Sequence, residues 1–140
     1  MIVAMTRSLG EIGLSVKRLQ MRHHRAIDAE LAPLGVSLVQ WDALRHLARK
    51  PEASLHDLAQ LTFQTDQSFG SLAARMVERG LIERVDGPGR AVRHRLTAKG
   101  NEVQRAGEAV VERVLAGSFV ALSADELARF DRLLVKLLSG

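Results

Sequence analysis

The 140-residue sequence contains no cysteine, which excludes disulfide bonds, thiolate metal sites and redox sensing through a thiol. Aromatic residues make up only 4% of the chain, so we expect a core built mainly from leucine, valine and alanine. No apolar run reaches the length that spans a membrane, and the first residues lack the ordered regions of a signal peptide. These absences predict a cytoplasmic protein that does not associate with membranes.

Residues that would carry catalysis or hold a metal are missing as well. The sequence has no nucleophile motif, no glycine-rich phosphate loop and no carboxylate pair on a buried face, so we expect neither enzyme activity nor a cofactor. His24 and Asp28 are four residues apart, a spacing that can place two metal ligands on one helix face. The five histidines are otherwise scattered, and surface or packing positions are the preferred interpretation. We therefore predict no metal site.

The most informative stretch of the sequence runs from Ser54 to Gly100. Ser54 and Asp57 have the spacing of a capping box at the start of a short helix with an apolar stripe. Thr65 can cap a second helix, which Gly80 would end. Two short helices with a turn of about four residues between them fit the helix-turn-helix plan, in which the second helix enters the major groove of DNA.

The second helix is expected to expose polar side chains opposite its apolar face. Gln, Ser and Thr side chains can hydrogen-bond base edges or phosphates, and Arg can do either. Gly70 allows two interpretations, close approach to a phosphate or a tight helix crossing, and the crossing is preferred. The candidate DNA-binding residues of this helix are Thr65, Asp66, Gln67, Ser68, Ser71 and Arg75.

A basic β-hairpin is predicted directly after Gly80, where the apolar period changes. The run Asp86-Gly87-Pro88-Gly89 is a strong turn signal between two short strands with alternating side chains. Charges on such strands also protect an ordinary sheet edge from aggregation. Next to the helix pair, however, they favour DNA contact, with the tip arginine in the minor groove. The candidate residues are Arg84, Arg90, Arg93 and Arg95.

The positive charge of the protein is concentrated in the same stretch. The formal net charge is +4 at pH 7. Between Arg75 and Lys99, seven Lys and Arg residues stand against three acidic residues, so the remainder of the chain is neutral overall. This distribution is the electrostatic footprint of a nucleic-acid-binding protein, and double-stranded DNA is the expected partner.

Long helices are predicted on both sides of this stretch. Amphipathic patterns indicate helices over about 8–31 and 38–49, a helix from 97 to about 119, and a last helix to about 138. The terminal helices carry more apolar surface than one protomer can cover, which predicts a homodimer with an extensive interface. We expect one domain over 1–140, with dimerisation helices at 1–35 and 101–140 and the DNA-binding region at 36–100.

Several short motifs in this order resemble one family of regulators. The pattern consists of Leu38, Gln40, Trp41, Leu44 and Leu47, then the helix pair, then Arg79-Gly80-Leu81-Ile82, Arg90 and Leu96-Thr97-x-Lys99-Gly100. It resembles the multiple antibiotic resistance regulator (MarR) family over nearly the whole chain. The family's wing carries Asp-x-Arg; here Arg90 matches the arginine, Pro88 takes the aspartate position, and Asp86 lies two residues earlier.

The resemblance implies a mainly α fold with a small β-hairpin, a winged helix-turn-helix with terminal dimerisation helices. It also implies a dimeric transcriptional regulator, in this family usually a repressor and often released from DNA by a small molecule. A two-fold dimer presents two recognition helices, so we expect it to bind an inverted-repeat operator. An effector pocket would lie between the dimer helices and the DNA unit, where His24, Trp41 and Arg45 are the candidate ligand-binding residues. The plain alternatives are a core tryptophan and a solvated arginine. The alternative function is a winged helix that binds another protein instead of DNA.

Overall fold

The computed structural model describes residues 7–87, 89 and 91–140. Its elements are α1 (Leu9–Leu31), the 3-10 helix η1 (Ala32–Leu34), α2 (Leu38–Arg49), α3 (Leu55–Leu61), α4 (Asp66–Glu78), β1 (Ile82–Val85), β2 (Arg93–Leu96), α5 (Ala98–Phe119) and α6 (Ala124–Leu138). The two strands pair in antiparallel fashion. This architecture confirms the mainly α fold with a small β-hairpin.

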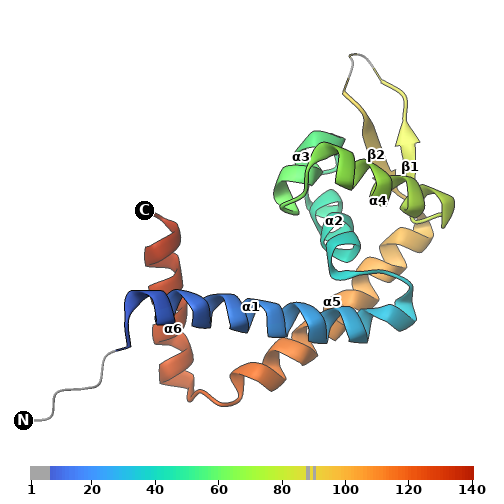
Figure 1. The fold of residues 1–140 in the computed structure, drawn as a ribbon. Coiled ribbons are helices and arrows are strands. Elements are labelled where there is room, and N and C mark those ends of the chain that lie inside the picture. Colours follow the sequence, from blue (N-terminus) through green and yellow to red (C-terminus); the bar gives the residue numbers. More distant parts are fainter. Residues whose placement is uncertain (1–6, 88, 90) are drawn as a thin grey trace, which may run out of the picture.

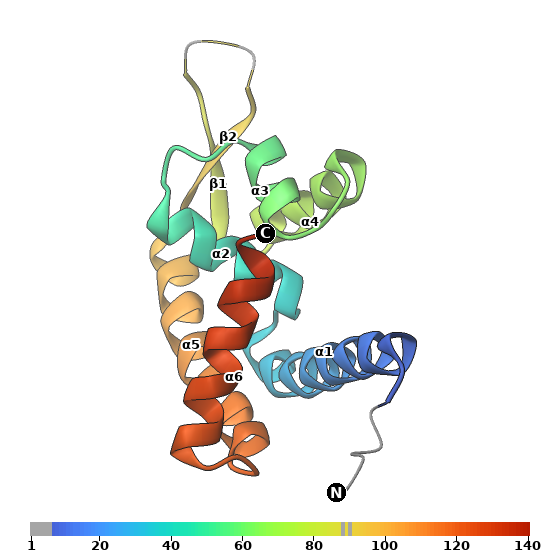
Figure 2. The ribbon, with the colours of Figure 1, turned by 90° about the vertical axis from the view of Figure 1, so that its left-hand side faces the viewer.

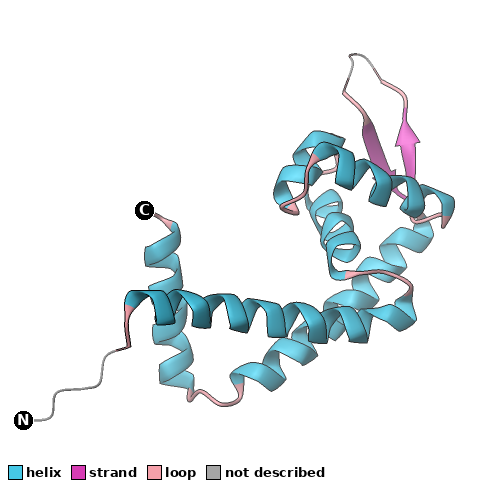
Figure 3. Cartoon of the chain, in the orientation of Figure 1, coloured by secondary structure: helices cyan, strands magenta, loops and turns pink. Residues whose placement is uncertain are grey.

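The elements divide into a lobe and a set of long helices (Figure 1). α2, α3, α4 and the hairpin form the lobe at the C-terminal end of α1, and the hairpin projects away from the helices (Figures 1 and 2). α5 runs from the lobe past α1, and α6 turns back from the end of α5 and crosses α1 near its N-terminal part in Figure 1. Figure 3 shows how far the helices outweigh the strands. Within the described ranges, no helix is both long and apolar enough to cross a membrane.

Side-chain caps determine where the helices begin. In each α-helix, the hydroxyl of the N-cap residue accepts a hydrogen bond from the backbone N–H three residues later. These N-caps are Ser8, Ser37, Ser54, Thr65, Thr97 and Ser123. The boxes that begin at Ser37, Ser54 and Ser123 are closed by the reciprocal bond as well. Each cap typically contributes about 1 kcal/mol, so local chemistry sets the helix boundaries.

The hydrophobic core lies mainly in the lobe. Phe69 of α4 and Leu44 of α2 are completely buried and belong to one cluster with Leu58 of α3. Trp41 anchors α5 to this core, because its indole lies where a Cβ at Gly107 would be. A single cluster therefore holds the recognition-helix candidate α4 against the long helices.

The terminal helices keep a large apolar surface exposed in one protomer. α6 has no buried residue, and its Leu133 and Leu137 are 51% and 76% exposed. An apolar groove of about 410 Å³ lies between α1 and α6 and is lined by Leu19, Phe130 and Leu134, among others. This surface is what a dimerising protein presents when its partner is removed.

The first turn of α5 packs directly on the backbone of Leu81. The backbone N–H and the hydroxyl of Thr97 both donate to the Leu81 carbonyl, at 3.1 Å each. A Cβ at Gly100 would overlap that carbonyl oxygen, so only glycine fits there. Gly80, with φ of +73°, supplies the left-handed turn that leads from α4 into this contact.

We expect Gly100→Ala to destabilise the protein by about 1–3 kcal/mol, because the added methyl and the Leu81 carbonyl need the same space. Gly70 in α4 is the matched control, since a Cβ there meets no atom within 4 Å. Gly70→Ala should stabilise the protein by up to about 1 kcal/mol through helix propensity. Urea unfolding at one protomer concentration measures both changes, and a Gly100→Ala protein as stable as the parent would contradict the packing described.

Candidate nucleic-acid interface

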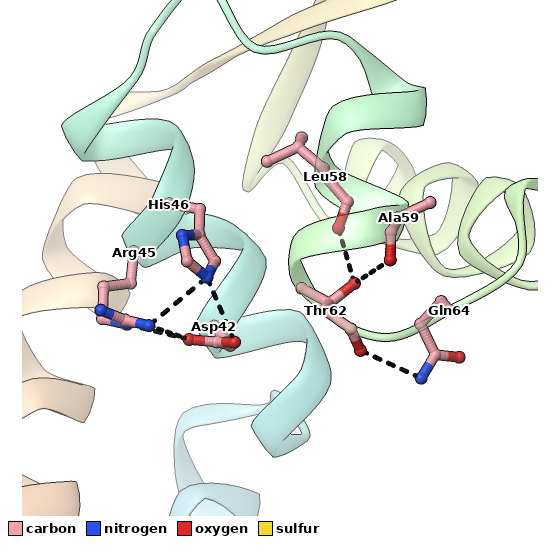
Figure 4. A network of polar contacts seen from close by, with 7 residues as sticks. All are labelled: Asp42, Arg45, His46, Leu58, Ala59, Thr62 and Gln64. Atoms are coloured by element: carbon pink, nitrogen blue, oxygen red, sulfur yellow. Dashed lines mark hydrogen bonds and ion pairs between the residues drawn. The ribbon is translucent and has the colours of Figure 1, made fainter. Parts of the chain in front are cut away.

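A hydrogen-bonded turn joins α3 to α4. The Thr62 hydroxyl donates to the Leu58 carbonyl at 2.7 Å, and the Gln64 N–H donates to the Ala59 carbonyl at 2.8 Å. Figure 4 shows the side chains of Thr62 and Gln64 facing the end of α3. The bond that spans five residues is the Schellman pattern, with Phe63 in the left-handed conformation at φ of +60°. The turn therefore fixes the angle between the two helices.

The second helix presents the polar face that the sequence predicts. All six candidate residues are exposed: Thr65, Asp66, Gln67, Ser68, Ser71 and Arg75. The Thr65 hydroxyl is engaged in capping Ser68 N–H at 3.0 Å, and the Ser68 hydroxyl donates to Gln64 at 3.1 Å. Phe69 and Met76 form the opposite, buried face. Val77, one residue after Met76, is 40% exposed, because it borders an open groove.

An ion pair that the sequence did not reveal sits at the start of α4. The Nδ1 atom of His56 on α3 lies 2.8 Å from Oδ1 of Asp66, and both side chains are 60% exposed. Ten residues separate them in the chain, so no helical spacing points to the pair. When His56 is protonated, it offsets the one carboxylate among the candidate residues, which would otherwise repel DNA phosphates.

The register of the hairpin sorts its arginines onto two faces. Arg84 pairs with His94, and Glu83 pairs with Arg95. Because directly opposite residues project to the same side of a sheet and neighbours alternate, Arg84 and His94 share one face. Both line a groove with residues of α4, so this face is turned toward α4. Arg95 lies on the other face.

The remaining hairpin arginines differ in their partners. Arg95 forms an ion pair with Glu83, with its Nε 2.5 Å from Oε1 of that glutamate. Nε of Arg93 donates to the Glu52 carbonyl at 3.1 Å, which ties the strand to the loop before α3. Arg84 forms no hydrogen bond or ion pair with the described residues. Arg90, the candidate at the hairpin tip, lies outside the described residues, as does Pro88.

An open groove of about 410 Å³ separates α4 from the hairpin. Its lining residues are Leu55, Gly70, Ala73, Ala74, Val77, Arg84, Val92 and His94. The preferred interpretation of Gly70, a tight helix crossing, is wrong, because no atom lies within 4 Å of a Cβ built there. The other interpretation, close approach to a phosphate, remains a prediction.

His94 is a buried polar residue on the inner face of the hairpin. Its side chain is only 5% exposed, and its Nδ1 atom has no hydrogen-bond partner in the described structure. Burial lowers the pKa of His94, and the positive charge of Arg84 lowers it further. The sequence hint was its position between Arg93 and Arg95, since strand alternation places it opposite two exposed residues.

The candidate effector residues are already engaged within the protomer. The Trp41 indole N–H donates to the Gln104 carbonyl at 3.0 Å, and the ring is 4% exposed. The Arg45 guanidinium lies 5.8 Å from the centre of that ring. Its Nε and Nη2 atoms both donate to Asp42, at 2.9 and 2.7 Å. Trp41 and Arg45 thus lie together at the junction of α2 and α5.

His24 stands apart from that pair, on α1. Its Nε2 atom lies 3.3 Å from Oδ2 of Asp28, and the other oxygen of Asp28 accepts the N–H of Leu38 at the start of α2, at 2.6 Å. Asp28 therefore contacts His24 within α1 and joins α1 to the start of α2. None of the three residues lines the groove along α1, the groove between α1 and α6 or the groove beside α2 and β2.

Asp42 organises a second polar cluster on α2, shown in Figure 4. Besides Arg45, it lies beside His46, whose Nε2 is 3.4 Å from Oδ2. Burial lowers the pKa of His46, while the Asp42 carboxylate opposes this effect. Figure 4 shows this cluster and the turn at Thr62 and Gln64 as separate sets of bonds, with none drawn between them, so the cluster acts within α2.

The turn-linked helix pair, its exposed polar face and the adjacent arginine hairpin define a winged helix-turn-helix transcriptional regulator. Comparison with known proteins agrees. A model described as MarR family matches residues 34–91. The HTH-type transcriptional repressor Rv2887 of Mycobacterium tuberculosis is 31% identical over 113 residues, which are 79% of this chain and 81% of the relative. The chain belongs to the MarR family, and it is a regulator, not an enzyme.

Solved structures show the same relationship. The M. tuberculosis MarR family protein Rv2887 in complex with salicylic acid is 28% identical, with a TM-score of 0.76, and the match covers 96% of this chain and 99% of that one. The same protein in complex with DNA is 26% identical, with a TM-score of 0.76 and coverage of 94% and 98%. The protein is thus similar over nearly its whole length to a regulator crystallised with DNA and with an aromatic acid.

The lowered pKa of His94 makes stability depend on pH. Its folded-state pKa lies below the ordinary 6.5, so the unfolded chain takes up the proton first as the pH falls. The contribution of neutral His94 to the free energy of unfolding is therefore complete above about pH 6.5. Below that pH it is lost by about 1.4 kcal/mol per pH unit until the folded pKa is reached.

We expect the free energy of unfolding to fall between about pH 7.5 and about pH 5, and His94→Leu to reduce that fall, because leucine removes the buried titrating group. Urea unfolding at several pH values measures the difference between parent and variant. His46 contributes in the same direction in both proteins, so part of the dependence persists. Parallel pH profiles for parent and variant would show that His94 is not responsible.

Proposed function

We propose that this protein is a transcriptional repressor that binds an inverted-repeat operator in double-stranded DNA as a homodimer. The observation that carries the proposal is the placement of Arg84 beside α4, on the face of the hairpin that shares a groove with that helix. A polar helix face and an arginine without a partner among the described residues, on one side of the lobe, suit a major groove and its bordering phosphates.

Within α4, we assign base contacts to the residues near its N-terminus. Gln67 is exposed, and a glutamine can form two hydrogen bonds with adenine. Ser68 and Ser71 are the other base-contact candidates, and Thr65 and Arg75 are assigned to phosphates or bases. Asp66 can accept from a cytosine amino group, and its pairing with His56 limits its repulsion of phosphates.

The hairpin arginines are assigned two roles. Arg84 faces α4 without a partner among the described residues and is assigned to a phosphate beside the major groove. Arg90 is assigned to the minor groove because of its place in the sequence at the hairpin tip, where an arginine gains most from a narrow A·T-rich segment. Arg93 and Arg95 are each held by a protein partner, so they contribute mainly long-range positive charge.

Arg84 and Arg95 form a matched pair for testing this assignment, because both are exposed arginines of the same hairpin. Arg84→Ala should weaken binding by about 1–3 kcal/mol and reduce the salt dependence by about one phosphate contact. Arg95→Ala should change affinity much less, because its guanidinium is already paired with Glu83. Fluorescence anisotropy over a salt series, with a duplex selected from a random pool by the parent, measures both.

Equal losses for the two variants would show that the hairpin acts only through its total charge, and the proposed orientation would fail. Thermal unfolding of each variant serves as the control, since both side chains are exposed and neither substitution should lower the melting temperature appreciably.

The proposed dimer implies that different parts of the chain serve dimerisation and DNA binding. We assign residues 1–35 and 101–140 to dimerisation and residues 36–100 to DNA binding. The apolar surface of α6 and its groove with α1 support the first assignment, and the exposed face of α4 supports the second. Because chromosomal DNA is the proposed target, we place the protein in the cytoplasm.

We propose that an aromatic acid releases the protein from DNA. The support is the relative crystallised with salicylic acid and with DNA, together with Arg45 beside Trp41. The Arg45 guanidinium makes two hydrogen bonds to the Asp42 carboxylate, and a ligand carboxylate would exchange with Asp42. A ligand that prefers a protomer arrangement mismatched to the operator must weaken DNA binding by the same coupling energy. His24 is the third candidate contact.

Salicylate at millimolar concentration is expected to change Trp41 fluorescence and to weaken operator binding by about 5- to 150-fold. The signal is unambiguous because Trp41 is the only tryptophan. Arg45→Gln should abolish both responses, whereas Arg49→Gln, an exposed arginine on the same helix, should retain them. If salicylate alters neither the fluorescence nor the affinity, the effector proposal should be abandoned while the DNA-binding proposal stands.

A further inference from the structure

Phe63 occupies a position that normally belongs to glycine. It follows the last turn of α3, where the Gln64 N–H bonds back to the Ala59 carbonyl at 2.8 Å. In this C-terminal motif the residue just before the N–H donor adopts the left-handed conformation. Here that residue is Phe63, with φ of +60°. It is the one non-glycine residue with positive φ in the described ranges. A side chain with a Cβ is strained there, whereas glycine is not.

The phenyl ring contributes nothing visible to the fold. It is 93% exposed, the most exposed of the large apolar side chains in the described part of the chain. The turn is held instead by its neighbours, through the Thr62 hydroxyl on Leu58 and the side chain of Gln64 on the Thr62 carbonyl. Stability of the fold alone would favour glycine at position 63. We therefore infer that the phenyl ring contacts another molecule.

The position of Phe63 identifies that partner. It lies two residues before Thr65, the N-cap of α4, and the N-terminal residues of a recognition helix are those that meet base edges. The ring therefore borders the surface proposed to enter the major groove and continues it. The apolar group that the major groove offers to a phenyl ring is the 5-methyl group of thymine.

We propose that Phe63 is a specificity-determining residue that packs against the methyl group of a thymine at the edge of each operator half-site. This inference rests on the proposed function, because it requires α4 to occupy the major groove. The turn bonds hold the backbone of Phe63 before DNA arrives, so little conformational freedom is lost on binding. The backbone strain is then offset by a contact that exists only in the complex.

The test compares Phe63→Ala, Phe63→Leu and the parent on a duplex selected from a random pool by the parent. In a second set of duplexes, each thymine in turn is replaced by uracil, which lacks only the methyl group. Loss of one methyl contact should weaken parent binding by about fourfold per half-site. At the thymine that Phe63 contacts, this loss should vanish in Phe63→Ala and persist in part in Phe63→Leu.

Phe63→Gly separates a binding role from a structural one. Glycine relieves the left-handed strain, so the melting temperature should rise, while affinity for the selected duplex should fall as it does for Phe63→Ala. A residue needed only for folding could not produce these opposite changes. Equal affinity of Phe63→Ala and the parent would overturn the inference.

Further outcomes separate this inference from the proposed function. Weaker binding of Phe63→Ala with an undiminished uracil effect at every thymine would assign the ring to sugar or phosphate, and the specificity role would fail. A parent that selects no duplex at all would overturn the proposed function and this inference together. Selection by the parent of duplexes that all Phe63 variants bind equally well would overturn this inference alone.

Discussion

The contact between the Leu81 backbone and the first turn of α5 is the constraint on which the rest of the structure depends. Two donors of Thr97 converge on the Leu81 carbonyl, the Thr97 hydroxyl also reaches the Gly80 carbonyl at 2.5 Å, and Lys99 caps the Arg79 carbonyl at 3.0 Å. This junction joins the end of α4, the base of the hairpin and the start of α5. A glycine at position 100 is what allows the three to meet.

The junction explains how the surface for DNA and the dimer helices are connected. α4 and the hairpin leave it in one direction, and α5 leaves it toward α1 and α6 (Figure 1). A shift of α5, which Trp41 and Gly107 hold against the lobe, must therefore move α4 with it. Arg45 and Asp42 lie next to Trp41, so a ligand that separates them acts where the movement of the lobe is determined.

Much of the fold followed from local sequence signals. The caps at Ser54 and Thr65, the short turn between the two helices and the turn at Gly80 appear in the structure where the sequence placed them, because each depends on hydrogen bonds to backbone nearby. The sequence also predicted the excess of apolar surface on the last helix. The resemblance to the MarR family was correct, and its motif Leu-Thr-x-x-Gly corresponds to the junction on Leu81.

Features that depend on contacts distant in sequence were not predictable. The His56–Asp66 pair joins two helices, and the distinction between Arg84 and Arg95 requires the strand register and the Glu83 partner. Neither has a local pattern. The backbone strain at Phe63 was not predictable either, because the sequence shows that a turn lies there but not which of its residues has a positive φ. Trp41 and Arg45 fit an effector site by type, but only the structure shows that each is already bound within the protomer.

Selection of bound duplexes from a random pool, with the stoichiometry determined by sedimentation, tests the central claim most directly. If the α5 junction holds one recognition helix per protomer and the terminal helices form the dimer, the selected sequence will be an inverted repeat. Its half-site centres will lie about one helical turn apart, with two protomers per duplex. A monomer that binds a single unrepeated site with full affinity would contradict the account.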